Sequence, residues 1–415
     1  MKRGSYHRPN FAAIAPLSMT KPLTAGDFQQ TADRSLIDEL IGSVASGTPR
    51  HRVRVLQRVT DLFVAGSRRY SNEQIALFDD VLQKLATEIE YKARVKLAQR
   101  LAYLESAPPR LMRSLAFDDA IGVAGPVLAN SPQLSDDDLA ENAASKSQDH
   151  LQAIAQRISL SEKVTDVLVD RGNRRVVRTV AANRGARFSL AGYGKLTARA
   201  RYDRKLTLTL GQRSDIPRQF FLKLVENASA AVRAKLIAGN PELAAAIRDV
   251  VGVVAGAIQK DSREASPEYV TAARDAKRRF SGHDVTEHNV HAPARAQEFE
   301  KTVLALARLG RFPVDIVERA LIDEGDDMVL VLARAAGCSW ATTKELLAMY
   351  AAGRKLGPDE MARSYERFEQ LSRETAQSVV DYHLRRMDRL NALTARAAEA
   401  AERGSAPVPA DLSNA

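Results

Sequence analysis

Apolar residues recur along most of the chain at the three- and four-residue spacing of a helix that buries one face. The first such run begins near Ser35, where Leu36 and Leu40 lie one turn apart. Later runs are separated by short connections rich in Gly, Asn and Asp. One run, residues 205–212, alternates like a strand, but it has no second strand to pair with and is better assigned to the start of a helix. The pattern therefore predicts an all-α protein.

Three short helical stretches resemble one another, and each contains an asparagine where the helix should end. They contain Asn130, Asn183 and Asn240, which are 53 and 57 residues apart. Self-similarity of this kind is typical of stacked helices that share one continuous core. The sequence therefore predicts a helical repeat domain over residues 31–260.

The remaining segments differ from these repeats in composition. Residues 261–294 are charged and poor in aliphatic side chains, which is typical of a linker. Residues 295–403 have apolar positions of their own and are expected to form a C-terminal helical domain. We expect its last part, after Pro358, to be one long helix through which a second copy of the chain could pair. Residues 1–30 are expected to be a mobile basic leader, and residues 404–415 a disordered tail.

Local signals predict where several helices begin and end. Ser71 and Ser135 are suited to cap helices that follow them. Asp136–Asp138 then lie in a first turn, where carboxylates complement the helix dipole; a bound divalent cation is the alternative. Pro126 lies where a helix should continue, so we expect a kink or a restart at Gly125.

The composition is that of a soluble protein with a sizeable core. The chain has 415 residues, of which 45% are hydrophobic and 27% are charged. A single cysteine, Cys338, excludes an intramolecular disulfide and fits a reducing cytoplasm. The longest apolar run, Val250–Ile258, is about half of what a membrane-spanning helix needs. We therefore expect a cytoplasmic protein with no membrane span.

Basic charge is concentrated in one part of the chain. Between residues 171 and 205 there are eleven basic residues against one acid, Asp203, and this net charge of +10 equals that of the whole chain. The basic residues are Arg171, Arg174, Arg175, Arg178, Arg184, Arg187, Lys195, Arg199, Arg201, Arg204 and Lys205. Such clustering produces a field that attracts phosphates or an acidic protein.

Three interpretations of this basic face remain open. It could bind an acidic protein partner, it could bind nucleic acid with Tyr193 and Tyr202 stacking on bases, or its arginines could simply solvate the outer side of two repeats. Helical spacing predicts that Val176, Val177 and Val180 face the core and that the neighbouring arginines face solvent.

No pattern of catalytic or cofactor-binding residues stands out. His283, Asp284, Glu287, His288 and His291 have spacings that could hold a metal on a helix, but they lie in the predicted linker, where solvated side chains are the simpler interpretation. No phosphate-binding glycine loop, zinc-protease motif or nucleophile elbow is present. The sequence therefore gives no support for an enzyme and predicts no cofactor and no metal site.

Residues Ala107–Leu139, APPRLMRSLAFDDAIGVAGPVLANSPQLSDDDL, resemble a bacterial family known only as domain of unknown function 2336. Further shared positions include Leu77–Asp79, His150, Arg157 and Cys338–Trp340. The resemblance covers residues 35–355 and implies an all-helical protein with HEAT-like repeats, without any settled activity or catalytic residue.

Together these observations predict a HEAT-like helical array, an α-solenoid, followed by a smaller C-terminal helical block with a long terminal helix. The expected function is a cytoplasmic scaffold or adaptor that binds a protein partner on the basic face. Nucleic-acid binding through the same face is the alternative.

Overall fold

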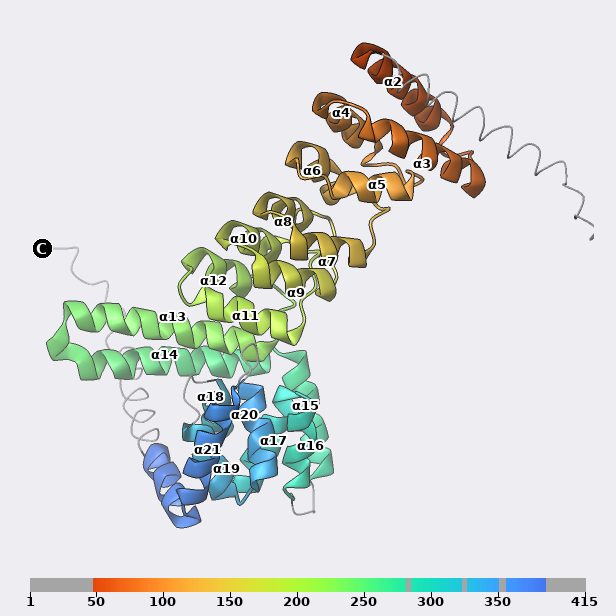
Figure 1. The fold of residues 1–415 in the computed structure, drawn as a ribbon. Coiled ribbons are helices and arrows are strands. Elements are labelled where there is room, and N and C mark those ends of the chain that lie inside the picture. The colour runs from red at the N-terminus through yellow and green to blue at the C-terminus, as the bar shows by residue number, and fades with distance from the viewer. Residues whose placement is uncertain (1–47, 281–284, 323–326, 351–355, 386–415) are drawn as a thin grey trace, which may run out of the picture. The chain divides into compact units, whose positions relative to one another are not determined.

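The computed structural model describes residues 48–280, 285–322, 327–350 and 356–385 (Figure 1). Within these ranges every regular element is a helix, and the β-type pairing is limited to one isolated bridge between Leu160 and Ala186. The prediction of an all-α protein is therefore confirmed for this part of the chain. The expected leader at residues 1–30 and tail at residues 404–415 lie outside the described residues.

The first of two compact units ends at Val127 and also contains residues 131–133. Its helices are α2 (Pro49–Gly66), α3 (Asn72–Thr87), α4 (Tyr91–Leu101), α5 (Pro109–Ala116) and most of α6 (Ile121–Asn130). Leu82, Leu101 and Leu111 are fully buried and form part of its core. Ser71 caps α3 as predicted: its hydroxyl accepts the Gln74 N–H, while the Gln74 side chain accepts the Ser71 N–H at 2.9 Å.

Asp79 is a buried carboxylate that joins α3 to α5. Its two oxygens accept the backbone N–H groups of Arg110 and Leu111 at 2.9 and 2.8 Å. Helix α5 begins at a proline and has no cap from its own N-terminal side chain, so Asp79 satisfies donors that would otherwise stay unpaired. One of the positions that carries the family resemblance therefore stabilises a helix end.

Helix α6 runs without interruption through Pro126, so the predicted restart at Gly125 is wrong. Proline removes one backbone donor from the helix. Val123, Val127 and Leu128 are fully buried on either side of it. Burial of these side chains outweighs the single hydrogen bond that the proline cannot make.

The second unit begins with three pairs of short helices. They are α7 (Asp136–Ser145), α8 (Gln148–Ala155), α9 (Glu162–Arg171), α10 (Arg174–Ala182), α11 (Leu190–Ala200) and α12 (Arg204–Gly211). Helices α7, α9 and α11 contact one another in turn, and so do α8, α10 and α12, which gives two layers of helices. The pairs begin 26 and 28 residues apart, about half of the spacing between the asparagines that suggested a repeat. Residues 205–212 belong to α12 and its C-cap, as predicted.

Long polar side chains connect each pair to the pair before it. Arg171 donates to the Ala143 carbonyl at the end of α7, and Arg199 donates to the Gly172 carbonyl at the end of α9 at 2.7 Å. In the second layer, the Asn183 side chain donates to the Ala155 carbonyl, and Arg213 donates to the Ala181 carbonyl at 3.0 Å. Because the last carbonyls of a helix have no partner within it, these bonds satisfy groups that every short helix leaves open.

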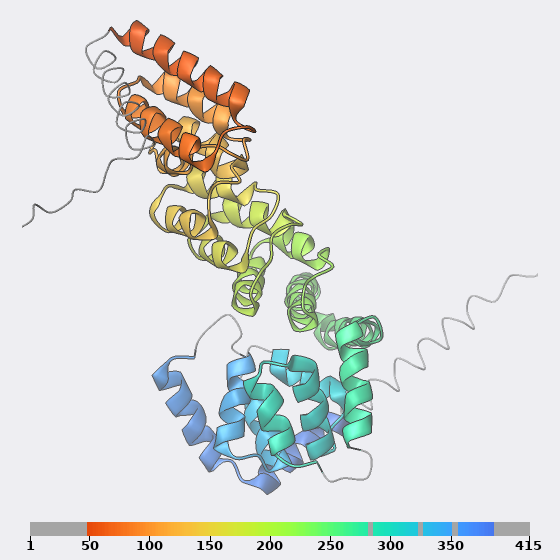
Figure 2. The ribbon, with the colours of Figure 1, turned by 90° about the vertical axis from the view of Figure 1, so that its right-hand side faces the viewer.

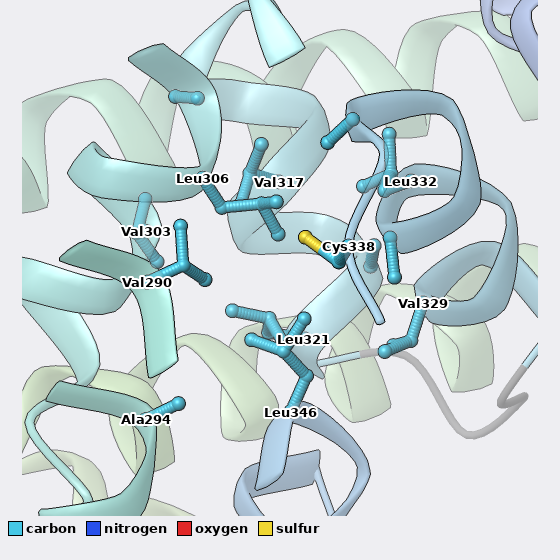
Figure 3. Packing of buried hydrophobic residues seen from close by; sticks show 14 of the residues in the cluster. Val290, Ala294, Val303, Leu306, Val317, Leu321, Val329, Leu332, Cys338 and Leu346 are labelled. Carbon is cyan, nitrogen blue, oxygen red and sulfur yellow. The ribbon is translucent and has the colours of Figure 1, made fainter. Parts of the chain in front are cut away.

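A larger group of helices completes the second unit. They are α13 (Arg218–Gly239), the 3₁₀ turn η1 (Pro241–Leu243), α14 (Ala244–Glu264), α15 (Pro267–Arg279), α16 (His288–Arg295), α17 (Phe299–Gly310), α18 (Val314–Ile322), α19 (Asp327–Ala336), α20 (Trp340–Tyr350) and α21 (Pro358–Gln370). Their core packs Val290, Leu306, Val317 and Leu332 around the buried thiol of Cys338 (Figure 3).

The segment predicted as a linker, residues 261–294, is mostly helical. It contains the end of α14, all of α15 and most of α16. Val290 and Ala294, four residues apart, are fully buried in the core, so the expectation of an exposed linker is wrong for this segment. Val290 and Ala294 are small apolar side chains among many charged ones, so the sequence pattern did not reveal that this segment contributes to the core. The predicted domain boundaries at residues 260 and 295 stay predictions.

The long terminal helix after Pro358 is also wrong within the described residues. Helix α21 ends at Gln370, and a separate helix covers residues 373–385. Between them Leu371 is extended, and Arg334 donates to its carbonyl at 2.7 Å. The Ser372 hydroxyl accepts the Thr375 N–H at 3.1 Å and so caps the second helix. A continuous apolar periodicity concealed this break.

A buried charge network connects α13 to α17 and α18. The Arg218 guanidinium donates to Glu300 at 2.9 Å and to Glu318 at 2.6 Å, and the Glu318 side chain is fully buried. Gln259 of α14 donates to the other oxygen of Glu318 at 2.6 Å. Burial raises the pKa of Glu300 above its ordinary value, although Arg218 opposes this shift.

We expect Arg218→Ala to lower the free energy of unfolding by roughly 3–5 kcal/mol, because the mostly buried Glu300 would lose its cation and the fully buried Glu318 would keep only the Arg263 Nε, at 3.5 Å, as a cationic partner. Urea denaturation of the full chain measures this change. The control is Arg278→Ala, which removes an arginine that is 84% exposed and paired with Asp275; its effect should stay within about 0.5 kcal/mol. Similar losses for both variants would show that the network does not stabilise the fold.

Candidate partner-binding surface

The structure divides the eleven basic residues into some that hold the fold together and some that are exposed. Arg171 and Arg199 bond to carbonyls at the ends of neighbouring helices, as described above. Lys195 forms an ion pair with Asp170 of α9. These three side chains are therefore engaged within the stack, and their charges are shared with other parts of the protein.

Arg178 and Asp203 form the strongest contact within the basic segment. The guanidinium donates to both carboxylate oxygens, at 2.8 and 2.7 Å, and Asp203 is only 6% exposed. Asp203 also caps α12 by accepting the Leu206 N–H at 3.2 Å. The hydrogen bonds from Arg178, together with this cap, lower the pKa of Asp203, although its partial burial acts the other way. Arg178 was expected to face mainly solvent, but through its hydrogen bonds to Asp203 it connects α10 to the start of α12.

Five basic residues are exposed along the edge where α9 connects to α10 and α11 connects to α12. We call them the basic edge: Arg174, Arg175, Arg201, Arg204 and Lys205. Four of them lie in the first turn of α10 or α12, where the backbone N–H groups add positive potential. Arg175, Arg204 and Lys205 have no ion-pair partner among the residues that the structure describes, whereas Arg174 approaches Asp203 at 3.7 Å.

Arg184 and Arg187 are exposed but do not belong to this edge. They follow the C-terminal end of α10, and a helix of nine residues separates its ends by about 14 Å. Val176, Val177 and Val180 are buried between these ends, as their spacing predicted.

The two tyrosines proposed to stack on bases have different environments. Tyr193 is 3% exposed, and its hydroxyl donates to the Asp215 carbonyl at 3.1 Å. Burial raises its pKa to about 12. Tyr202 is 77% exposed and lies beside the Arg201 guanidinium. Only Tyr202 is placed where it could meet a ligand, so the prediction for Tyr193 is wrong.

Sequence reasoning missed Arg213, which lies just outside the basic segment. Its guanidinium donates to the carbonyls of Ala181, Asn183 and Ala186 at 2.7–3.0 Å and contacts the Phe188 ring. The signal that could have revealed this role is its position 31 residues after the end of α10 at Ala182, close to the spacing of 26 and 28 residues between successive pairs.

Among His283, Asp284, Glu287, His288 and His291, which were considered as metal ligands, Glu287 caps a helix. Glu287 accepts the Ser339 N–H at 2.7 Å and the Ser339 hydroxyl at 2.6 Å, next to the start of α20. Burial alone would raise the pKa of Glu287, but the hydrogen bonds from Ser339 and Thr342 lower it below its ordinary value. His283 and Asp284 lie outside the described residues.

Metal-binding and nucleophilic chemistry find little support in the side chains that are described. Within the described ranges, no three His, Cys, Asp or Glu side chains are grouped to hold a metal. Asp138, one of the three carboxylates of Asp136–Asp138, caps α7 reciprocally with Ser135, as the position of Ser135 predicted. Burial raises the pKa of Cys338 to about 12, so its thiol stays protonated at neutral pH.

None of the helices in the described ranges combines the length and apolar character needed to cross a membrane.

Residues 123–381 match the model of a family described as "Uncharacterised protein conserved in bacteria (DUF2336)". This match confirms the family predicted from the sequence; residues 107–122 and Leu77–Asp79, which also suggested it, lie outside the matched range. No curated protein and no solved structure matches the chain.

The lowered pKa of Asp203 predicts a pH-dependent contribution to stability. A carboxyl whose pKa is lower in the folded state stabilises the protein above its unfolded pKa of about 3.9, and this contribution disappears as the pH falls through the folded pKa. Asp203→Asn should therefore lower the thermal midpoint near neutral pH, and its difference from the wild type should shrink as the pH falls below about 3.9. Thermal unfolding of both proteins across this range measures the effect. A difference independent of pH would mean that the charge of Asp203 is unimportant.

Proposed function

The chain belongs to the DUF2336 family of uncharacterised bacterial proteins, and we propose from its own geometry that it is a helical-repeat scaffold that binds an acidic protein segment on the basic edge. The observation that carries this proposal is the grouping of Arg174, Arg175, Arg201, Arg204 and Lys205 around the amino-terminal ends of α10 and α12. Exposed charges of one sign contribute little to folding, so a ligand accounts for their grouping better than stability does.

The alternating contacts of α7 to α12 support an α-solenoid as the scaffold. In such an array each pair of helices contacts only its neighbours and presents its connections along one edge. The helices have 8 to 11 residues, so each pair is shorter than the roughly 40–47 residues of a HEAT repeat. We propose a compact variant of the HEAT-like arrangement, in a cytoplasmic protein.

An acidic protein is favoured over nucleic acid by the small size of the basic edge. A nucleic-acid strand needs a continuous basic track and aromatic platforms. Arg184 and Arg187 lie away from the edge, Tyr193 is buried, and only Tyr202 is exposed beside it. Nucleic-acid binding is therefore the second candidate.

The proposal is tested by reversing the charges that have no structural partner. Arg175→Glu with Arg204→Glu and Lys205→Glu should leave the thermal midpoint within a few degrees, since surface substitutions usually change stability by no more than about 0.5 kcal/mol each. Proteins captured by the full wild-type chain from nuclease-treated native lysate should be lost. Arg178 is left unchanged because reversing it would place two carboxylates together.

The matched control is Arg68→Glu with Arg69→Glu and Lys92→Glu, an equal charge change at exposed positions of the first unit. It should retain the captured partner. If both triple variants bind equally, the basic edge is not the binding surface. Loss of binding on nuclease treatment, with a steep decrease of affinity for a DNA duplex as salt rises, would support nucleic acid instead.

Pairing of two chains through the C-terminal helix also stays a proposal. The structure describes residues 358–385 of the segment expected to pair, and residues 386–403 lie outside the described residues.

A further inference from the structure

Helices α13 and α14 form a hairpin whose far half lacks a core. They have 22 and 21 residues and lie side by side, joined by η1 (Figures 1 and 2). Near its base, Phe220, Leu222 and Leu224 are buried, and so is Gln259. From Ala228 to Ile258 no residue is buried.

This exposed stretch is rich in aliphatic side chains. Those that are at least 37% exposed are Val232, Leu236, Leu243, Val250, Val254 and Ile258. Val250 is 63% exposed and Val254 54%. Monomeric proteins seldom expose so many large apolar side chains together, unless the surface binds something.

The exposed residues form one stripe on each helix. Val232 and Leu236 are one turn apart on α13, and Val250 and Val254 are one turn apart on α14, with Leu243 two turns before Val250. In an antiparallel pair, stripes that lie about 90° from the direction of helix–helix contact are on the same side, and helical spacing leads us to place these two stripes there. The other side of the pair faces α18 and α19, where residues of all four helices line a cavity of about 470 Å³.

We infer that this apolar side of the hairpin is where two copies of the chain associate, with two hairpins packing into a four-helix bundle. Such a bundle would bury the stripes of both copies in one core. A twofold contact uses the same surface on each copy, so that surface must complement itself.

The charges of the hairpin favour a second copy over other partners. Over residues 228–258 the basic residues are Arg233, Lys235 and Arg248, and the acidic ones are Glu242 and Asp249. Arg233, Arg248 and Asp249 line the cavity on the other side of the pair, which leaves one basic and one acidic residue, Lys235 and Glu242. The whole chain carries a net charge of +10, so two copies repel each other over most of their surface but not here. Nucleic acid and anionic lipid, by contrast, are attracted by net positive charge, which this surface lacks.

The dimensions of the surface are those of a weak interface. The exposed stretch of each helix is about 20 Å long, and packed helices lie about 8–10 Å apart. With its side chains, a surface of this size approaches the roughly 600 Å² per partner at the lower limit of stable interfaces. The resulting dimer should therefore depend on concentration.

The test is sedimentation of the full chain over a concentration range of roughly 1–100 µM. We expect the wild type to form dimers, and Val250→Glu with Val254→Glu to weaken dimerisation at least tenfold by placing four carboxylates in the bundle core. The control is Ile158→Glu with Leu208→Glu, which changes apolar residues that are 94% and 56% exposed on other helices or their connections. It should dimerise like the wild type.

A second measurement does not depend on weakening the dimer. Val250→Cys should react with a maleimide more slowly as the concentration rises and the dimer covers it, whereas Ile158→Cys should react at the same rate throughout; the native Cys338 is 4% exposed and should not react. A wild type that stays monomeric throughout would overturn the inference. So would a dimer that persists in the double variant or is lost only on removing residues 386–415. Binding of the monomer to phosphatidylglycerol vesicles through Val250 would instead identify a membrane surface and would also overturn it.

Discussion

The carbonyl groups at the ends of short helices are the constraint on which the stack of α7 to α12 depends. Each helix of 8 to 11 residues leaves four carbonyls without an intrahelical partner, a large share of its backbone. The chain satisfies many of them with Arg171, Arg199 and Arg213 from the following pair, and with the amide of Asn183. Arginine suits this task because its long side chain reaches across a layer and its donors point in several directions.

Because several arginines bond to groups inside the protein, the basic composition of this segment does not by itself indicate a binding surface. A cluster of charge in the sequence suggests a ligand, yet several members of this cluster have partners inside the protein. The carboxylate of Asp203 engages Arg178, and Asp170 engages Lys195. The binding proposed above therefore rests on a smaller group of exposed residues at the amino-terminal ends of α10 and α12.

Local patterns in the sequence predicted local structure well. Ser71 and Ser135 cap their helices, and Val176, Val177 and Val180 are buried, because capping and helical periodicity depend on residues within one or two turns. The carbonyl partners of Arg171 and Arg199 could not be predicted, since they are set by the stacking of pairs. The same holds for α16, whose burial depends on the helices around Val290 and Ala294. The basic edge was predicted as a segment, but only the fold separates its exposed members from Arg178.

The direction of these arginine contacts has a consequence for synthesis of the chain. In these arginine contacts the donor lies in the later pair and the carbonyl in the earlier one, for example Arg199 with Gly172 and Arg213 with Ala181; Gln148 of α8 donates in the opposite direction, to the Arg171 carbonyl. As the chain leaves the ribosome from its amino terminus, each pair of helices therefore emerges with some of its end carbonyls open. It receives its last hydrogen bonds only when about one further pair has been translated, so the stack is completed in the order in which it is made.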